Sequence, residues 1–232
     1  MRKIAIILAR SGSKGLEDKN IMELCGKPMM NYSIEAALEA ACFDRIILST
    51  DSVKYGKIGE KCGAEVMYRD ESLASDTATT YMVLEDLFSQ INHDFDYFVL
   101  LQPTSPLRTT QNIKEAIEVF ERNINRFDFL VSMKVAEHNH LLVKPVEEDM
   151  SLKHFDADFA NYRRQGVVDY SPNGAIFIGK VEPYLKQKHF FGARAIGYIM
   201  NDVDSIDVDN TLDYRLASLC MEERLKAGHS NG

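Results

Sequence analysis

The feature that most constrains the fold is a regular alternation between short apolar runs rich in β-branched residues and longer stretches of helical periodicity. The apolar runs are continuous, which is typical of strands buried on both faces of a sheet. Strands joined by helices in this way form a mostly parallel, doubly wound sheet with right-handed crossovers. The sequence therefore predicts an α/β fold class. The predicted strands are residues 4–8, 45–49, 64–67, 97–101, 129–135, 174–178 and 195–200.

Helices are predicted where apolar residues recur at intervals of three and four. Pro28 suits the first turn of one helix, because its missing N–H is not needed there. Thr109 or Thr110 can cap another helix, because a threonine hydroxyl accepts a hydrogen bond from the first turn. The remaining predicted helices are residues 53–62, 77–91 and 211–225.

The alternation breaks at residues 136–172, a polar stretch that is too long for an ordinary connection. We interpret it as an arm inserted into a single domain that spans residues 1–232. A long polar excursion is hard to keep ordered alone, so the arm predicts a homodimer. We expect surface or dimer-contact roles for its histidines, His138, His140 and His154.

The acidic balance of the chain excludes some classes of function. The formal net charge is −8, whereas a generic nucleic-acid binder presents a basic face. No apolar run is long enough to span a membrane, and the first run ends at Arg10, short of a signal peptide. The four cysteines lack metal-ligand spacing, which indicates free thiols in a reducing, cytoplasmic compartment. An anionic small substrate would need a local cationic pocket.

A cationic segment follows the first predicted strand. Arg10, Lys14 and Lys19 lie within ten positions, around Gly12 and Gly15. Glycines let a backbone approach an anion closely, and exposed N–H groups can hold phosphate oxygens. The segment matches neither a Walker A loop nor a G-x-G-x-x-G fingerprint. It predicts either an anion site at the carboxyl edge of the sheet, where open α/β sheets bind ligands, or a solvated basic turn.

A stiff polar loop, QPTSPLR at residues 102–108, follows the fourth predicted strand. Its two prolines restrict the backbone and leave Gln102, Thr104 and Ser105 as hydrogen-bonding groups. We expect this loop at the same sheet edge as the cationic segment. Taken alone, it fits a turn with a helix cap better than a binding site.

Four aspartates lie within eight positions at residues 202–209 (DVDSIDVD). A divalent cation with oxygen ligands would offset their mutual repulsion, especially beside a phosphate. In an extended chain Asp207 and Asp209 point to the same side, as Mg²⁺ ligation requires. The other interpretation is an acidic loop that caps the last helix through Asp209 or Asn210.

Together these segments place cations, a polar loop and a carboxylate pair around one sheet edge. Six motifs follow one another in a recognisable order: ARSGSKGLEDKN (residues 9–20), FDRIILSTD (43–51), ESLASDTATT (71–80), LLQPTSPLRT (100–109), NGAIFI (173–178) and DSIDVDNTLD (204–213). In this order they resemble the CMP-sialic acid synthetases, or N-acylneuraminate cytidylyltransferases. The resemblance implies a Rossmann-like sheet of the nucleotide-diphosphosugar transferase type, with an extended dimerisation arm.

The resemblance also implies an activity, the transfer of CMP from CTP to a nine-carbon acidic sugar with Mg²⁺ as the cofactor. It gives catalytic roles to Arg10 and Lys14 on the phosphates, and to Asp207 and Asp209 as metal ligands. Lys14 would lie near the reacting phosphate. The further residues that it assigns to CTP are Lys19, Asn20, Arg69 and Thr80.

On the sugar side, the resemblance implies that Gln102 and Ser105 contact or position the sugar. Arg163 or Arg164 would pair with the sugar carboxylate, since a guanidinium fork suits a carboxylate. The aromatic residues that would pack against the acyl group are Phe190 and Phe191.

This sequence departs from the family pattern in two places. Residues 163–169 read RRQGVVD, without the proline that the family carries before the NGAIFI motif, and Lys144 is the nearest match to a family lysine in the arm. Legionaminic, pseudaminic or 3-deoxy-octulosonic acid therefore stay open as alternative sugars. The alternative from another class is a non-catalytic nucleotide-binding regulator on the same fold.

Overall fold

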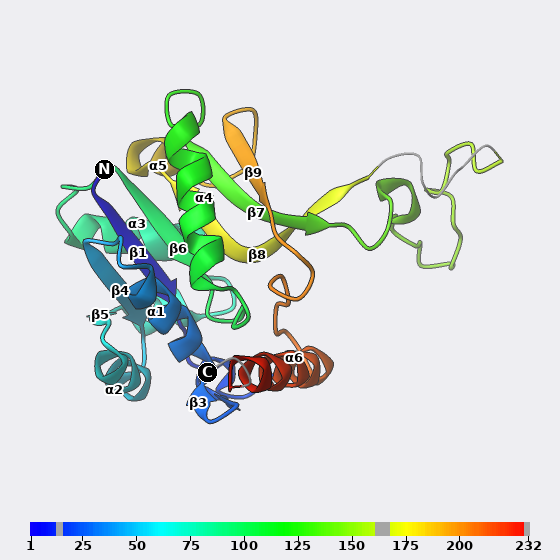
Figure 1. Cartoon of the computed structure of the whole chain (residues 1–232). Coiled ribbons are helices and arrows are strands. Elements are labelled where there is room, and N and C mark those ends of the chain that lie inside the picture. The colour runs from blue at the N-terminus through cyan, green and yellow to red at the C-terminus, as the bar shows by residue number, and fades with distance from the viewer. Residues whose placement is uncertain (13–15, 161–167, 230–232) are drawn as a thin grey trace.

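The computed structural model describes residues 1–12, 16–160 and 168–229. Within these residues, seven strands form one sheet in the order β5-β4-β1-β6-β8-β7-β9, with helices on both faces (Figure 1). Strands at the centre of such a sheet are apolar along their length because both faces are covered. The strands are β1 (Lys3–Leu8), β4 (Arg45–Thr50), β5 (Glu65–Tyr68), β6 (Tyr97–Leu101), β7 (Phe129–Val135), β8 (Tyr170–Gly179) and β9 (Ala195–Ile199).

The sheet is parallel except at β8. β1 pairs in parallel with β4 and with β6, β4 pairs in parallel with β5, and β7 with β9. β8 runs antiparallel to both of its neighbours, β6 and β7. The prediction of a mostly parallel, doubly wound sheet is confirmed. Periodicity gives no strand direction, so the reversal at β8 was not predicted.

Two layers of helices cover the sheet: α1 (Met29–Ala40), α2 (Val53–Cys62) and α4 (Thr110–Asn123) on one face, and α3 (Thr80–Gln90) and α5 (Val181–Gln187) on the other. Successive residues of β1 point to opposite layers. Ala5 and Ile7 are buried with the first layer, whereas Ile4 and Ile6 are buried with the second. Alternation along an extended strand explains why both faces of β1 must be apolar.

The last helix, α6 (Thr211–His229), packs outside these layers against a hairpin of β2 (Glu23–Leu24) and β3 (Lys27–Pro28). Leu24 of the hairpin and Val208 of the acidic loop are buried in the same cluster. This cluster of buried residues therefore brings residues 202–209 to the side of the molecule where the loop that follows β1 ends.

α3 and α4 each begin one residue after a threonine whose side chain caps the helix. α3 begins at Thr80 rather than at the predicted residue 77, because the Thr79 hydroxyl accepts a hydrogen bond of 3.2 Å from the Met82 N–H. α4 begins at Thr110 behind Thr109, which forms a capping box with Asn112. The elements that the sequence analysis did not predict are β2, β3, α5 and the 3-10 helices η1 (Lys19–Ile21), η2 (Glu71–Ala74) and η3 (His140–Leu142).

The predicted arm projects from the body of the molecule between β7 and β8 (Figure 1). It is shorter than the predicted residues 136–172, because Tyr170 already pairs with Val135 in the β7–β8 ladder. The pairing of β7 with β8 shifts register between Val131 and Met133 and then continues to Val135. The described part of the segment between these two strands is therefore residues 136–160 and 168–169.

All four cysteines carry free thiols. None of the described helices is long and apolar enough to cross a membrane. The reducing, cytoplasmic compartment stays a prediction.

Candidate functional site

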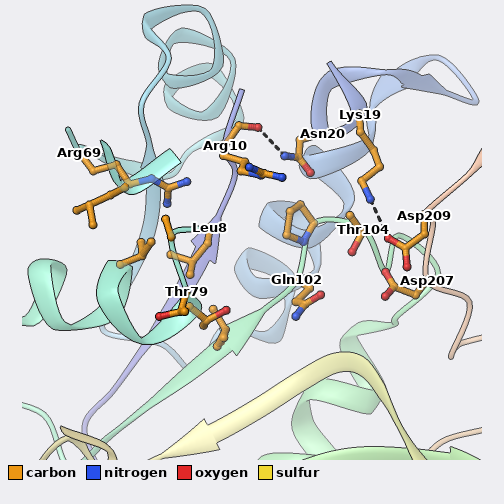
Figure 2. Close-up of a pocket in the computed structure, with 16 residues that line it drawn as sticks. Leu8, Arg10, Lys19, Asn20, Arg69, Thr79, Gln102, Thr104, Asp207 and Asp209 are labelled. Atoms are coloured by element: carbon orange, nitrogen blue, oxygen red, sulfur yellow. Dashed lines mark hydrogen bonds and ion pairs between the residues drawn. The ribbon is translucent and has the colours of Figure 1, made fainter. Parts of the chain in front are cut away.

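The carboxyl ends of β1 and β6 open onto a cavity of about 430 Å³, which we call the basic cavity (Figure 2). Three cations from separate segments line it, Arg10, Lys19 and Arg69. The predicted meeting of the cationic segment, the QPTSPLR loop and the acidic loop at one sheet edge is confirmed. The complete lining is Leu8, Arg10, Lys19, Asn20, Arg69, Leu73, Ala78, Thr79, Thr80, Val83, Leu100, Gln102, Pro103, Thr104, Asp207 and Asp209.

Arg10 follows β1 and reaches across to the segment between η2 and α3. Its Nη1 donates to the Ala74 carbonyl at 3.0 Å and to Asp76 Oδ1 at 3.1 Å. An anionic ligand in the basic cavity would compete with Asp76 for this guanidinium.

The short helix η1 places Lys19 and Asn20 on the opposite wall. Lys19 Nζ forms an ion pair of 2.9 Å with Asp209 Oδ1, as Figure 2 shows. Asn20 is buried, and its Nδ2 donates to the Arg10 carbonyl at 3.0 Å. Its Oδ1 has no hydrogen-bond partner in the described residues. Asn20 thus fixes the backbone at Arg10. Its buried Oδ1 is left without a donor, and an N–H group of a ligand could supply one.

Arg69 supplies a buried positive charge. Its side chain is only 9% exposed, and Nη1 donates to the Ser49 carbonyl at 3.3 Å and to Ser49 Oγ at 3.4 Å. Nε has no partner in the part of the chain that the structure describes. Burial lowers the pKa of the guanidinium, while the nearby charge of Asp51 opposes that shift. A buried cation with so few hydrogen-bond partners and so little negative charge around it favours an anionic ligand.

Asp51, which follows β4, holds the start of the first loop. Its Oδ1 accepts from the Ser11 N–H at 2.9 Å, and its Oδ2 accepts from the Ser11 hydroxyl. Asp51 ends the motif FDRIILSTD, but no role was predicted for it. The signal that could have found it is an aspartate directly after a parallel strand.

Asp207 and Asp209 both line the basic cavity, as their spacing predicted. Gly174 makes room for Asp207: a Cβ at this glycine would lie 3.2 Å from Asp207 Oδ2 and 3.4 Å from Gln102 Oε1. Its φ of +78° also favours glycine. Helix capping is done by Asn210, whose Oδ1 accepts from the N–H groups of the first turn of α6 at 2.8 and 3.1 Å. Asp209 is therefore not needed as the cap.

The surroundings of Asp207 disfavour its charge. Burial raises the pKa of this carboxyl and the negative charge of Asp209 adds to the effect, while a hydrogen bond from Thr104 and the charge of Lys19 oppose it. Asp207 Oδ1 is buried and has no hydrogen-bond partner in the described residues. No cluster of three or more metal-ligating side chains occurs in the described chain. Two carboxylates nevertheless fit Mg²⁺, which is commonly held by one or two carboxylates together with substrate phosphates.

A second cavity of about 490 Å³, the aromatic cavity, lies beside the basic cavity. Thr79, Thr80, Leu100 and Gln102 line both cavities. Phe190 is buried in a group of rings, 4.6 Å from Tyr184 and 5.0 Å from Phe177 between centroids. Its neighbour Phe191 is 47% exposed and also lines the cavity. The other lining residues are Tyr81, Phe177, Tyr184, Lys188 and His189.

A third cavity of about 810 Å³ lies between the base of the arm and α6. We call it the acidic cavity because Glu137, Asp202, Asp207 and Asp213 line it. Gln102 lines all three cavities. The structure therefore places Gln102 at the junction of the three.

A family model described as "Cytidylyltransferase" matches residues 4–224. This span contains every segment of the basic cavity. The chain belongs to the cytidylyltransferase family. The resemblance to CMP-sialic acid synthetases is confirmed by relatives of that name.

An N-acylneuraminate cytidylyltransferase of Escherichia coli is 40% identical over 95% of this chain and 52% of its own length. One of Streptococcus agalactiae is 44% identical over 92% of this chain and 52% of its own length. The chain thus spans about half the length of these two cytidylyltransferases. A CMP-N,N'-diacetyllegionaminic acid synthase of Legionella pneumophila is 31% identical and is covered over 97% of its length.

A solved structure of a CMP:2-keto-3-deoxy-manno-octonic acid synthetase complexed with CTP superposes with a TM-score of 0.74. The match covers 97% of this chain and 100% of that one at 14% sequence identity. This likeness shows that the two cytidylyltransferases share a fold.

Most of the residues that the family resemblance singled out line the basic or the aromatic cavity. Arg10, Lys19, Asn20, Arg69, Thr80, Gln102, Asp207 and Asp209 line the basic cavity, and Phe190 and Phe191 line the aromatic cavity. Ser105 is fully buried and is not among the lining residues of the three cavities, so its sugar contact stays a prediction. Lys14, Arg163 and Arg164 lie outside the described residues.

Proposed function

We propose that this chain transfers CMP from CTP to the anomeric hydroxyl of N-acetylneuraminic acid and releases pyrophosphate. The observation that carries the proposal is the basic cavity, where three cations and two carboxylates meet at one sheet edge beside an aromatic cavity. A triphosphate with a divalent cation matches that charge pattern, and a sugar with an N-acyl group matches the aromatic wall.

The shared lining of the two cavities supports one substrate in each. CTP would occupy the basic cavity, with its phosphates near Arg10, Lys19 and Arg69. The sugar would occupy the aromatic cavity, with its acyl methyl group against Phe191. Because Gln102 belongs to both cavities, it can contact the sugar where the two substrates meet.

In the proposed reaction the oxygen of the anomeric hydroxyl attacks the α-phosphate of CTP, the bond to pyrophosphate breaks, and the proton of that hydroxyl is released to solvent. Mg²⁺, held by Asp207 and Asp209, would supply charge stabilisation at the phosphates. Arg10, Lys19 and Lys14 would orient the phosphates and offset their developing charge. Asn20 and Thr80 would help to hold the nucleoside.

The closest alternative keeps this chemistry with another sugar. The Legionella relative, which its name assigns to N,N'-diacetyllegionaminic acid, favours legionaminic acid as the second candidate. Pseudaminic acid and 3-deoxy-octulosonic acid remain further candidates. A non-catalytic regulator would bind CTP without turning it over.

The test is to incubate the protein with CTP, Mg²⁺ and each sugar in turn and to separate the CMP-sugar by anion exchange. We expect CMP-N-acetylneuraminate, with the octulosonate a poor substrate. A kcat/KM for legionaminic acid more than about tenfold above that for N-acetylneuraminic acid would reassign the sugar. CTP binding without any CMP-sugar would support the regulator.

Replacing Phe191 with alanine should weaken use of the sugar selectively. Loss of an apolar contact is worth about 1–3 kcal/mol, or roughly 10–200-fold in kcat/KM. Initial rates should therefore show a lower kcat/KM for the sugar and an unchanged KM for CTP. Met82→Ala is the matched control, because Met82 is similarly exposed on the neighbouring α3 but does not line the cavity. Equal effects of the two variants would contradict a sugar role for Phe191.

The arm should form a homodimer in solution. Its described residues expose a series of apolar side chains that a monomer would leave in water: Leu142, Val143, Val146, Met150, Leu152 and Phe159. Burying such a series against a second copy is the simplest way to remove it from water. Light scattering at micromolar concentration should give twice the mass of one chain. A monomer at that concentration would refute the dimer.

A further inference from the structure

Arg108, the last residue of the QPTSPLR loop, is a buried arginine that the proposed chemistry has not used. Its side chain is 3% exposed. Nη1 donates to two backbone carbonyls, that of Gln102 at 3.1 Å and that of Ala175 at 3.0 Å. Arg108 therefore joins the segment that follows β6 to β8.

The environment of Arg108 does not suit a purely structural arginine. Nε and Nη2 have no hydrogen-bond partner in the described chain. Burial lowers the pKa of the guanidinium to about 9. A buried charge is weak evidence for a role in stability, because taking it out of water is costly. A buried and incompletely satisfied polar group of this kind calls for an explanation other than stability.

The two carbonyls belong to the segments that shape the junction of the three cavities. Gln102 lines all three. Ala175 follows Gly174, whose missing Cβ lets the side chains of Gln102 and Asp207 approach β8. The Gln102 carbonyl also accepts from Ser33 Oγ at 3.1 Å, so its backbone is held from α1 as well. Moving Arg108 would break the hydrogen bonds that tie the Gln102 backbone to Ala175 in β8.

We propose that Arg108 is a positioning residue that fixes the direction of the Gln102 side chain and so aligns the sugar with the α-phosphate of CTP. The inference rests on the proposed function, because it takes Gln102 as a sugar contact. A misplacement of about 1 Å in an aligned pair of reactants can cost roughly a hundredfold in rate.

The test uses Arg108→Lys, which keeps the charge, and Arg108→Met, which removes it at similar volume. The kcat/KM for the sugar should fall by about tenfold to a hundredfold in both variants. The Kd for CTP, measured by calorimetry without sugar, should stay within about threefold of the original protein in both variants. Arg122→Met is the matched control, because Arg122 is an exposed arginine on α4 paired with Glu118. It should change none of these quantities.

A double-mutant cycle shows whether Arg108 acts through Gln102. Arg108→Lys should have little further effect on the sugar kcat/KM in a Gln102→Ala background. Additive losses would overturn the proposal, as would an equal loss of CTP affinity. If Arg108→Met does not fold, Arg108→Lys decides the question alone.

A readout without turnover separates this inference from the proposed function. The side-chain amide resonance of Gln102, assigned by its disappearance in Gln102→Ala, should shift or broaden in Arg108→Lys and stay unchanged in Arg122→Lys. An unchanged resonance in Arg108→Lys would overturn the positioning role, whatever the sugar is. A shifted resonance in a protein that makes no CMP-sugar would support the positioning role and refute the proposed function.

Discussion

Replacing Asp207 with asparagine is expected to lower kcat by roughly 10²–10³ and, in the same protein, to raise the thermal midpoint without divalent cations. The first effect follows if Asp207 holds the cation that offsets phosphate charge. The second follows from burial beside Asp209, which disfavours the ionised carboxylate and raises its pKa. One substitution should thus remove activity and relieve an unfavourable charge.

The pH dependence of this gain in stability has a definite sign. Because the pKa of Asp207 is raised in the fold, its ionised form destabilises the fold above that pKa. The asparagine variant should therefore be the more stable one at neutral pH. Its advantage should shrink as the pH falls through the raised pKa, since Asp207 itself then takes up a proton.

Magnesium titrations and thermal unfolding test both effects. The control is Asp202→Asn, an exposed aspartate of the same loop that does not line the basic cavity. It should leave kcat and the half-saturating Mg²⁺ concentration unchanged. An Asp207→Asn variant with the kcat and the Mg²⁺ half-saturation of the original protein would reassign Asp207 to a structural role.

Replacing Lys14 with alanine is expected to lower kcat far more than it raises the KM for CTP. Lys14 lies in the sequence between Arg10 and Lys19, both of which line the basic cavity. The family resemblance places it near the reacting phosphate. A positive charge that acts on developing negative charge contributes roughly 10²–10³ in rate, and more in the transition state than in the ground state.

Initial rates at varied CTP measure this split between kcat and KM. Lys27→Ala is a suitable control, because Lys27 is a surface lysine paired with Glu35 and lies outside the basic cavity. A Lys14→Ala enzyme within about threefold of the original kcat would remove Lys14 from the chemistry.

The sequence predicted those parts of the fold that depend on local pattern. The run YFVLL at β6 is buried along its whole length, and its predicted bounds match the observed ones. The direction of β8 could not be predicted, because it depends on how the chain returns from the arm. α5 was missed because its seven residues give less than two full periods of helical spacing.

In the candidate site, too, local pattern predicted some residues and missed those whose partners are distant in the sequence. Arg10, Asp207 and Asp209 were found because charges in short motifs point to phosphate and metal. Asp51 and Arg108 were inside quoted motifs but received no role, since their importance comes from partners 40 and 67 positions away in the chain. Such pairings are visible only when the strands that carry them are placed side by side.

Transfer of CMP to the sugar is tested most directly by pyrophosphate release from CTP, ATP, GTP and UTP, each with Mg²⁺, in the presence and absence of N-acetylneuraminic acid. We expect release with CTP alone among the four nucleotides, and we expect that release to depend on the sugar. Comparable release from another nucleotide, or release from CTP that is indifferent to every acidic sugar offered, would contradict the proposed transfer.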